Sequence, residues 1–386
     1  MAENLENSAR SKSAPSEDDY ALKSTYGAPF PAPELAYEPP KPRNYAPKIG
    51  VIGCGGIIPF HLRAYQKQGF RVAALCNRTL EKAQKARDEF FPDARIFADA
   101  EAIFADESIE VVDITTHPDD RVALIARALE CGKHVLSQKP FVIDLGEGEE
   151  LVALAQKKGR RLAVNQNGRF SPHFSYARRA LEAALIGELV STHFRVHWNH
   201  GWIQNTPFEQ MPGIILYDFA IHWFDLTAQF WGENRAKRVF ATRAHAPSQT
   251  LRPPMLSQAL VEFETGQASL VFDAILPFGA RDTSYFGGTQ GSILCDGPDL
   301  NAQTVTIFNE NGHASPRLNG DWFSSGFEGA MGELLCAIEE NREPLNSAKS
   351  NLRSLELSFA AIESSLSGVP VEVGSVRRVP QGALRF

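Results

Sequence analysis

Residues 48–58 read Lys-Ile-Gly-Val-Ile-Gly-Cys-Gly-Gly-Ile-Ile, and Pro59 follows. The first five residues predict a short buried strand, the glycines predict a tight turn, and the proline opens an amphipathic helix. Gly53 permits the turn, Gly55 lets a pyrophosphate approach the backbone, and the helix N-terminus attracts anions. This order is the context that a dinucleotide fingerprint requires, although a plain tight turn has the same glycines. Ile58 occupies the third glycine position, which predicts either looser packing of the helix on the strand or a compensating shift.

Strands and helices alternate from residue 48 to residue 164. Further strands are expected at 71–76, 96–97, 111–115, 134–136 and 161–164, and helices at 80–90, 100–104, 119–131 and 145–158. Such alternation predicts an α/β fold with a doubly wound parallel sheet, which binds ligands at the carboxyl ends of its strands.

The end of the second strand bears on the choice of cofactor. NAD-binding sites usually place an acidic residue there, on the ribose 2′-hydroxyl. This chain has Asn77 and Arg78 instead. An amide does not repel a 2′-phosphate, and a guanidinium can pair with one, so NADP is favoured over NAD. Alternatively, Arg78 points into solvent or stacks on the adenine.

Residues at the strand ends are the expected ligand contacts. The residues expected to contact the cofactor are Gly53, Gly55, Gly56, Ile57, Asn77, Arg78, Thr115, His117, Gln138 and Lys139. Asn165, Asn167 and Arg169 follow the last strand and are candidates for substrate hydroxyls or the nicotinamide amide. Hydrogen bonding within their own loop is the alternative.

The second half of the sequence contains further strands and one conspicuous helix. Strands are expected at 190–198, 239–245, 259–264, 267–272 and 292–295, and late helices at 327–340 and 352–366. In the helix expected at 214–230, Asp218, His222 and Asp225 are spaced to share one face. A carboxylate beside a histidine raises the basicity of the imidazole, which suits a base that takes a hydroxyl proton. A structural histidine beside a solvated carboxylate is the alternative.

These motifs together resemble the Gfo/Idh/MocA oxidoreductases, named for glucose–fructose oxidoreductase and inositol dehydrogenase. The matching features are GCGGI at 53–57, His61 with Ala64, the run ALECGKHVL at 128–136 followed by Lys139-Pro140, and DFAIHWFD at 218–225. The resemblance covers residues 48–375. It departs at Gln138, where the family usually has glutamate, at Ala220 for glycine, and at Arg121 for a histidine.

The resemblance implies a two-domain NAD(P)-dependent enzyme that acts on a sugar, a polyol or a derivative. Residues 46–166 would bind the dinucleotide, and residues 167–386 would form an α/β domain with a large, mostly antiparallel open sheet. Lys139, Asp218 and His222 would carry the chemistry and contact the substrate, with Lys139 and His222 handling the proton of the reacting oxygen. Such proteins commonly form homodimers or homotetramers through the open sheet face. Loops at 202–213 and 278–288 would shape the substrate pocket.

Two other functions share these features. An NAD-dependent glycoside hydrolase keeps the nucleotide half but oxidises its substrate only transiently before elimination. A non-catalytic dinucleotide-binding sensor needs none of the three reactive side chains, all of which are present.

Composition narrows the remaining classes. The net charge of −7 gives no basic surface for nucleic acid, and no apolar run is long enough for a membrane span. Five scattered cysteines fit reduced thiols in a cytoplasmic enzyme. His193 and His197 lie on one face of an expected strand, with His200 just beyond it. The pair lacks a clear third ligand, so no metal is expected, and sheet packing or a substrate-facing edge is favoured.

Residues 1–45 differ in composition from the rest. Seven prolines stand between residues 28 and 47: Pro29, Pro31, Pro33, Pro39, Pro40, Pro42 and Pro47. They favour an extended arm. Such an arm is either a disordered tail or a strap on a neighbouring subunit.

Overall fold

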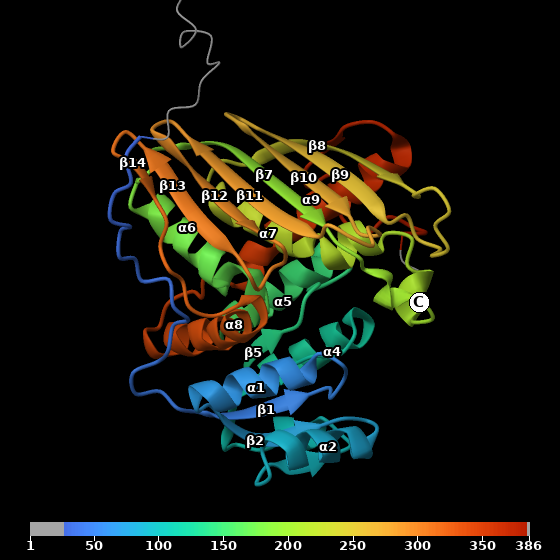
Figure 1. Cartoon of the computed structure of the whole chain (residues 1–386). Coiled ribbons are helices and arrows are strands. Elements are labelled where there is room, and N and C mark those ends of the chain that lie inside the picture. Colours follow the sequence, from blue (N-terminus) through green and yellow to red (C-terminus); the bar gives the residue numbers. More distant parts are fainter. Residues whose placement is uncertain (1–26, 384–386) are drawn as a thin grey trace, which may run out of the picture.

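Two α/β halves are stacked one above the other (Figure 1). This computed structural model describes residues 27–383. The nucleotide half, drawn below, contains the first part of the chain, and a broad twisted sheet forms the upper half. The functional side chains come from the region where the two halves meet.

The nucleotide half is a parallel sheet in the order β3-β2-β1-β4-β5-β6. Its strands are β1 (Lys48–Ile52), β2 (Arg71–Cys76), β3 (Arg95–Phe97), β4 (Ile109–Ile114), β5 (His134–Ser137) and β6 (Leu162–Val164). Its helices are α1 (Ile58–Gln68), α2 (Leu80–Phe90), α3 (Glu101–Phe104), α4 (Pro118–Glu130) and α5 (Leu145–Lys157). The order reverses between β1 and β4, which places the ligand crevice at their carboxyl ends. The predicted doubly wound sheet is confirmed.

The upper half is a mixed sheet in the order β14-β13-β12-β11-β7-β10-β9-β8-β15. Its strands are β7 (Leu189–His197), β8 (Ala236–Ala244), β9 (Leu256–Phe263), β10 (Gln267–Asp273), β11 (Arg281–Gly288), β12 (Gly291–Gly297), β13 (Thr304–Asn309), β14 (Gly312–Ala314) and β15 (Val371–Glu372). Helices α6 (Pro172–Glu182), α7 (Ile221–Phe230), α8 (Trp322–Glu339) and α9 (Ala348–Ser367) lie below it (Figure 1). Among the described strands of this upper sheet, only β7 and β10 pair in parallel, so the expected, mostly antiparallel sheet is confirmed.

One expected loop is a strand. Residues 281–288 form β11, in the middle of the sheet, rather than part of a pocket loop. The strand was missed because its buried inner face carries Asp282 and Ser284, which break the apolar alternation that marks a strand. Asp282 is paired with Gly297 on β12, so the backbone ladder forms despite the polar side chain.

The proline-rich segment from residue 27 to residue 47 is extended and lies against its own chain. The Glu339 carboxylate at the end of α8 accepts the backbone N–H groups of Arg43, Asn44 and Tyr45 at 2.6–2.9 Å. Tyr176 of α6 donates its hydroxyl to the Pro33 carbonyl at 2.8 Å. The described part of the arm is therefore ordered along its own chain. The expectation for residues 1–26 lies outside the described residues.

Helix α8 connects the two halves. It follows the upper sheet in sequence, yet it packs on α1 of the nucleotide half (Figure 1). Its buried Phe327, Met331 and Leu334 belong to the same apolar core as Ile49 and Leu62. The expected domain boundary at residue 166 therefore does not separate the apolar cores, because the core of the nucleotide half includes residues of α8.

The buried Asp282 makes stability depend on pH. Burial, with Asp299 and Asp296 nearby, raises the pKa of Asp282 to about 8. An unfolded aspartate has a pKa of about 4, so the folded state retains the proton and loses stability as the pH rises from about 4 to about 8. The loss is about 1.4 kcal/mol per pH unit within that window. Because asparagine binds no proton, we expect Asp282→Asn to gain stability relative to the original chain as the pH rises.

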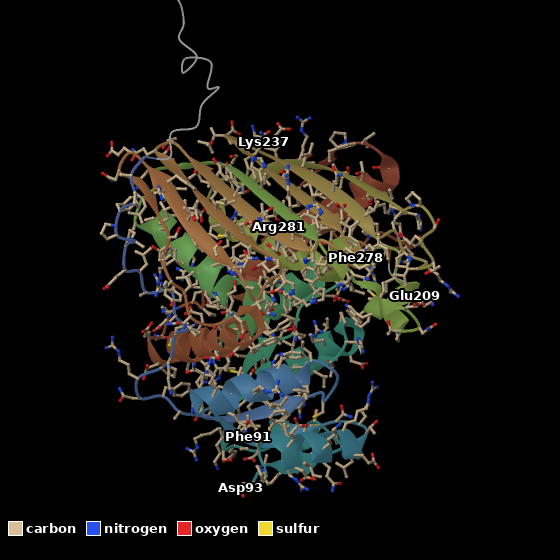
Figure 2. The ribbon with its side chains drawn as sticks, in the orientation of Figure 1. Phe91, Asp93, Glu209, Lys237, Phe278 and Arg281 are labelled. Carbon is tan, nitrogen blue, oxygen red and sulfur yellow. The ribbon has the colours of Figure 1, made fainter. Side chains whose placement is uncertain are left out.

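Denaturant unfolding at pH 5, 6.5 and 8 measures this difference. Asp93→Asn is the matched control, because Asp93 is exposed and lies at the far end of the nucleotide half (Figure 2). A stability difference for Asp282→Asn that stays constant with pH would contradict the assignment.

Candidate active site

The glycine loop after β1 is shaped to let a ligand approach the backbone. Gly53 has φ +99°, and a Cβ there would lie 2.9 Å from Thr115 Oγ1, so only glycine fits. A Cβ on Gly55 or Gly56 would meet no atom within 4 Å. No side chain caps the N-terminus of α1, and its first turn contains no acidic residue. These features fit a dinucleotide pyrophosphate.

Ile58 does not loosen the packing of α1. Its side chain is 3% exposed and belongs to the apolar core of the nucleotide half. The expectation of looser packing was wrong, because an apolar residue at this position packs into the interface between helix and strand.

Asn77 and Thr115 brace the glycine loop from both sides. Asn77 Oδ1 accepts the Cys54 N–H at 2.9 Å, and Thr115 Oγ1 donates to the Gly53 carbonyl at 2.6 Å. Arg78 extends into solvent, with 87% of its side chain exposed, and its Nη2 lies 3.1 Å from Asp120 Oδ2. Exposed pairs of this kind contribute little, so the guanidinium is available to an anionic ligand. His117 is the exposed N-cap residue of α4.

Lys139 and Asp218 meet across the two halves. Lys139 follows β5, and its Nζ lies 3.3 Å from Asp218 Oδ2 and donates to the Asp218 carbonyl at 3.0 Å. About a fifth of each side chain is exposed. The structure therefore joins two of the three predicted catalytic residues in a half-buried ion pair. Gln138, predicted to contact the cofactor, is 7% exposed and accepts the Lys139 N–H at 2.7 Å.

His222 does not form the expected pair with Asp218. Its Nδ1 is buried without a partner among the described residues, and burial, with the Lys139 charge, holds its pKa well below the ordinary value. The imidazole is therefore neutral near pH 7. The predicted increase in basicity from a neighbouring carboxylate was wrong, because Asp218 is bound to Lys139.

A π-helical turn interrupts the helix that was expected to place Asp218, His222 and Asp225 on one face. It spans Ile215–Phe219, and α7 begins only after it. The wider turn changes the angular spacing between Asp218 and the two α7 residues. Asp225 binds Arg169, with Oδ–N distances of 2.5 and 2.7 Å.

The three residues predicted to bind substrate are engaged within the protein. Asn165, Asn167 and Arg169 are at most 4% exposed. The Asn165 amide nitrogen lies 3.2 Å from His61 Nε2, and the Asn167 amide donates to the Trp322 carbonyl at 3.4 Å. The Arg169 guanidinium is bound to Asp225. These contacts reach α1, α7 and α8, so they are not confined to the loop of these residues, which was the alternative expected from the sequence.

His200 is a site residue that the sequence does not single out as catalytic. It is 8% exposed, and burial lowers its pKa to about 4, with smaller influences from the Asp218 and Lys139 charges. Its Nδ1 accepts the Trp202 indole N–H at 3.2 Å, so the proton of the neutral ring lies on Nε2. Its position just beyond the end of a strand was the available signal.

A wall of tryptophans adjoins His222. The Trp322 ring centroid lies 5.4 Å from that of His222, and Trp322 stacks on Trp223 at 5.8 Å. Trp198 meets Trp223 edge-on at 6.4 Å. The indole N–H groups of Trp198 and Trp223 are buried without a partner among residues 27–383.

The remaining histidines on β7 face the other side of the sheet. His193 Nδ1 lies 2.7 Å from Ser269 Oγ, and His197 Nδ1 lies 2.7 Å from Asp273 Oδ2. Among the described residues, no group of three His, Cys, Asp or Glu side chains is placed to hold a metal ion.

Family models match both halves of the chain. Residues 47–166 match an oxidoreductase family with an NAD-binding Rossmann fold, and residues 174–294 match the GFO/IDH/MocA C-terminal domain. The chain belongs to the Gfo/Idh/MocA oxidoreductase family. The predicted enzyme class, a nicotinamide-dependent oxidoreductase acting on CH–OH groups, is confirmed with it.

Named relatives of this Gfo/Idh/MocA protein include dehydrogenases. An uncharacterized oxidoreductase of Schizosaccharomyces pombe is 30% identical over 271 residues, which cover 65% of this chain and 71% of the relative. A D-apiose dehydrogenase of Paraburkholderia graminis is 26% identical and covers 85% of this chain and 90% of its own. The structure of a scyllo-inositol dehydrogenase from Lactobacillus casei, with NAD(H) and scyllo-inositol bound, has a TM-score of 0.73 at 21% identity. That alignment covers 86% of this chain and the whole of the other.

The contacts of Lys139 lead to a direct test. We expect Lys139→Met to lower turnover by about 10²- to 10³-fold, the range typical of a lost donor to an oxygen that develops negative charge. Cofactor affinity should remain within about threefold, because the methionine leaves the glycine loop untouched. Steady-state kinetics and a fluorescence titration with reduced cofactor measure the two quantities. Lys157→Met, which changes an exposed lysine of α5, is the control. Unchanged turnover in Lys139→Met removes this lysine from the mechanism.

Proposed function

We propose that this chain transfers a hydride between a nicotinamide dinucleotide and the hydroxyl- or carbonyl-bearing carbon of a sugar, a polyol or a derivative. The observation that carries the proposal is the Lys139–Asp218 ion pair beside a neutral His222, at the carboxyl edge of the nucleotide sheet. The D-apiose and inositol dehydrogenases among the relatives support the substrate class.

Each reactive side chain has a distinct role. When bound, the nicotinamide supplies the hydride acceptor or donor. Lys139 hydrogen-bonds the reacting oxygen and stabilises negative charge that develops on it. His222 is neutral, so it can take or return the hydroxyl proton. Asp218 holds the lysine ammonium in place. Oxidation of the alcohol thus yields a carbonyl, a reduced cofactor and one proton.

The tryptophan wall supports a hydroxylated substrate. Trp198 is partly exposed, and an unpaired buried N–H costs about 1–3 kcal/mol, so its indole gains from a ligand that accepts hydrogen bonds. Trp223 and Trp322 are at most 2% exposed, so they support Trp198 and His222 from within the core and do not contact the substrate. His200 Nε2–H adds a further donor.

The function is tested by incubating the protein with a panel of sugars and polyols and following nicotinamide absorbance. Net cofactor reduction on a member of the panel supports the proposal. Release of a chromogenic aglycone without net cofactor change would establish the glycoside hydrolase instead. Dinucleotide binding without turnover on any compound, together with a co-purifying partner protein, would favour the sensor.

We further propose that NADP is preferred over NAD. The exposed Arg78 guanidinium lies directly after Asn77, which holds the glycine loop, and at the end of the strand that approaches the adenosine ribose in this fold. No acidic side chain stands at position 77 to repel a 2′-phosphate.

A charge-assisted hydrogen bond is worth about 1.5–3 kcal/mol. We therefore expect Arg78→Ala to weaken NADPH binding by about 10- to 100-fold and NADH binding by less than about threefold. Fluorescence titrations with both cofactors measure the effect, with Lys85→Ala, an exposed cation of α2, as control. Equal losses for both cofactors, or none for NADPH, would refute the preference.

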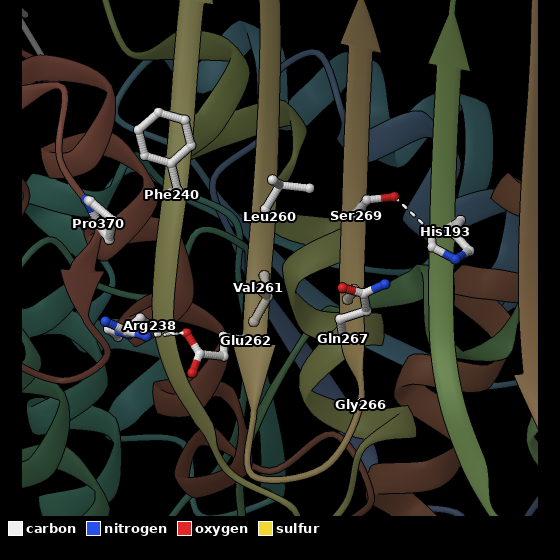
Figure 3. Close-up of a pocket in the computed structure, with 11 residues that line it drawn as sticks. His193, Arg238, Phe240, Leu260, Val261, Glu262, Gly266, Gln267, Ser269 and Pro370 are labelled. Carbon is white, nitrogen blue, oxygen red and sulfur yellow. Dashed lines mark hydrogen bonds and ion pairs between the residues drawn. The ribbon is translucent and has the colours of Figure 1, made fainter.

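We infer that the outer face of the upper sheet joins copies of this chain into a homodimer or homotetramer. A shallow pocket lies there, and Phe240, Leu260, Ser269 and His193 form a row across four strands (Figure 3). Leu260 is 59% exposed and Phe240 37%. Helices lie below the sheet, so this face has no cover within the described chain (Figure 1).

Light scattering after gel filtration tests this interface. We expect the original chain to have two or four times the 42.5 kDa chain mass and Leu260→Asp to have the chain mass alone, because the substitution buries a charge in an apolar contact. Leu80→Asp, at an exposed apolar residue of α2, should keep the assembly. A monomeric original chain would exclude the interface.

We also infer a cytoplasmic location. The five cysteines, all within the described residues, are free thiols. Between residues 27 and 383, no helix is long and apolar enough to cross a membrane.

A further inference from the structure

A buried network of hydrogen-bonded polar side chains lies behind Lys139. His61 of α1 is fully buried, and its Nδ1 lies 2.8 Å from Asp113 Oδ2 on β4. Tyr65 donates its hydroxyl to the same oxygen at 2.6 Å. Burial and the Asp113 charge raise the pKa of Tyr65 well above its usual value, so it keeps its proton. None of these groups contacts the reacting atoms proposed above.

Gln138 connects this network to the main chain of Lys139. Its Oε1 accepts the Lys139 N–H at 2.7 Å. A backbone N–H can only donate, so the amide oxygen must face Lys139 and the amide nitrogen must face the other way. That nitrogen lies 3.0 Å from His61 Nε2.

The orientation of Gln138 determines where the His61 proton lies. An amide NH₂ group can only donate, so His61 Nε2 must accept and carry no hydrogen. The Asn165 amide nitrogen, 3.2 Å from the same atom, is a second donor directed at it. His61 therefore carries its single proton on Nδ1 and donates it to Asp113.

We propose that Tyr65, Asp113, His61 and Gln138 form a positioning network that holds the main chain of Lys139. In this network His61 is neutral and carries its proton on Nδ1. The inference deepens the proposed function, on which the role of Lys139 rests. These are positioning residues, because they act on the reacting oxygen only through Lys139.

The surroundings of His61 support a single protonation state. Among the described residues, the groups printed in contact with the ring are Asp113, Tyr65, the Gln138 and Asn165 amides and the Phe327 ring, and Glu328 follows Phe327 on α8, where Lys67 of α1 binds it. Arg121 exerts its charge on Asp113 from α4. It also clamps the opposite side of the same segment, where its Nη1 donates to the Gln138 carbonyl at 2.6 Å and to the Pro140 carbonyl. Lys139 is thus held from both sides.

Two substitutions at one position separate the parts of this proposal. Gln138→Glu keeps an acceptor for the Lys139 N–H but turns an acceptor oxygen toward His61 Nε2, which must then gain a proton. Gln138→Leu removes both contacts. We expect turnover to fall by about 10- to 100-fold in Gln138→Leu, with the substrate KM changed less than about threefold, and to recover to within about fivefold of the original in Gln138→Glu. Gln156→Leu, at an exposed position of α5, should match the original chain.

The protonation state is measured without substrate. Long-range ¹H–¹⁵N spectra of protein labelled at histidine, with His61→Gln to assign the signal, report which ring nitrogen carries hydrogen. The original chain should show His61 protonated on Nδ1 alone, and Gln138→Glu should show both nitrogens protonated.

The two readouts fail independently. A proton on Nε2 in the original protein, or an unchanged His61 in Gln138→Glu, would contradict the proposed positioning network, whatever substrate the enzyme acts on. Equal turnover in Gln138→Leu and the original protein would show that the network does not position Lys139. Failure of Lys139→Met to lower turnover would instead overturn the proposed function and leave the spectra to decide the His61 assignment.

Discussion

The site depends on the buried ion pair between Arg169 and Asp225. Arg169 lies in the turn Asn167–Phe170 that leaves the nucleotide sheet, and Asp225 lies in α7. Asn351 and Ser354 of α9 donate to the same carboxylate, and Arg169 also reaches the Leu345 carbonyl. Breaking such a pair would leave an uncompensated buried charge, at a cost of about 3–5 kcal/mol. The pair therefore holds α7, and with it His222, against the edge of the nucleotide half.

Burial then determines which site groups are charged. His222 and His200 are desolvated and neutral near pH 7, whereas Lys139 and Asp218 keep partial exposure and pair with each other. Opposite environments for neighbouring titratable groups are the arrangement that acid–base chemistry needs. The network behind Lys139 lies deeper, where His61 and Asp113 are fully buried and hydrogen-bonded to each other.

Several features of the fold were predictable from local pattern. The parallel sheet, the glycine loop and the position of Lys139 after β5 follow from alternating strands and helices, which depend on neighbouring residues alone. Strand β11 was not predictable in this way, because Asp282 and Ser284 face inward. The packing of α8 on α1 joins segments more than 250 residues apart, which no local period reveals.

By itself the sequence determined the fold class, the family, and the identity of Lys139, Asp218 and His222 as candidates, because turn chemistry, periodicity and motif order are properties of short segments. Only the tertiary structure decided how those candidates pair. Asp218 pairs with Lys139 and not with His222, and Asp225 pairs with Arg169 in the core. His61 and His200 gained their positions in the same way. Hydrogen-bond partners and desolvation are set by groups distant in sequence, and these decide proton locations and charge.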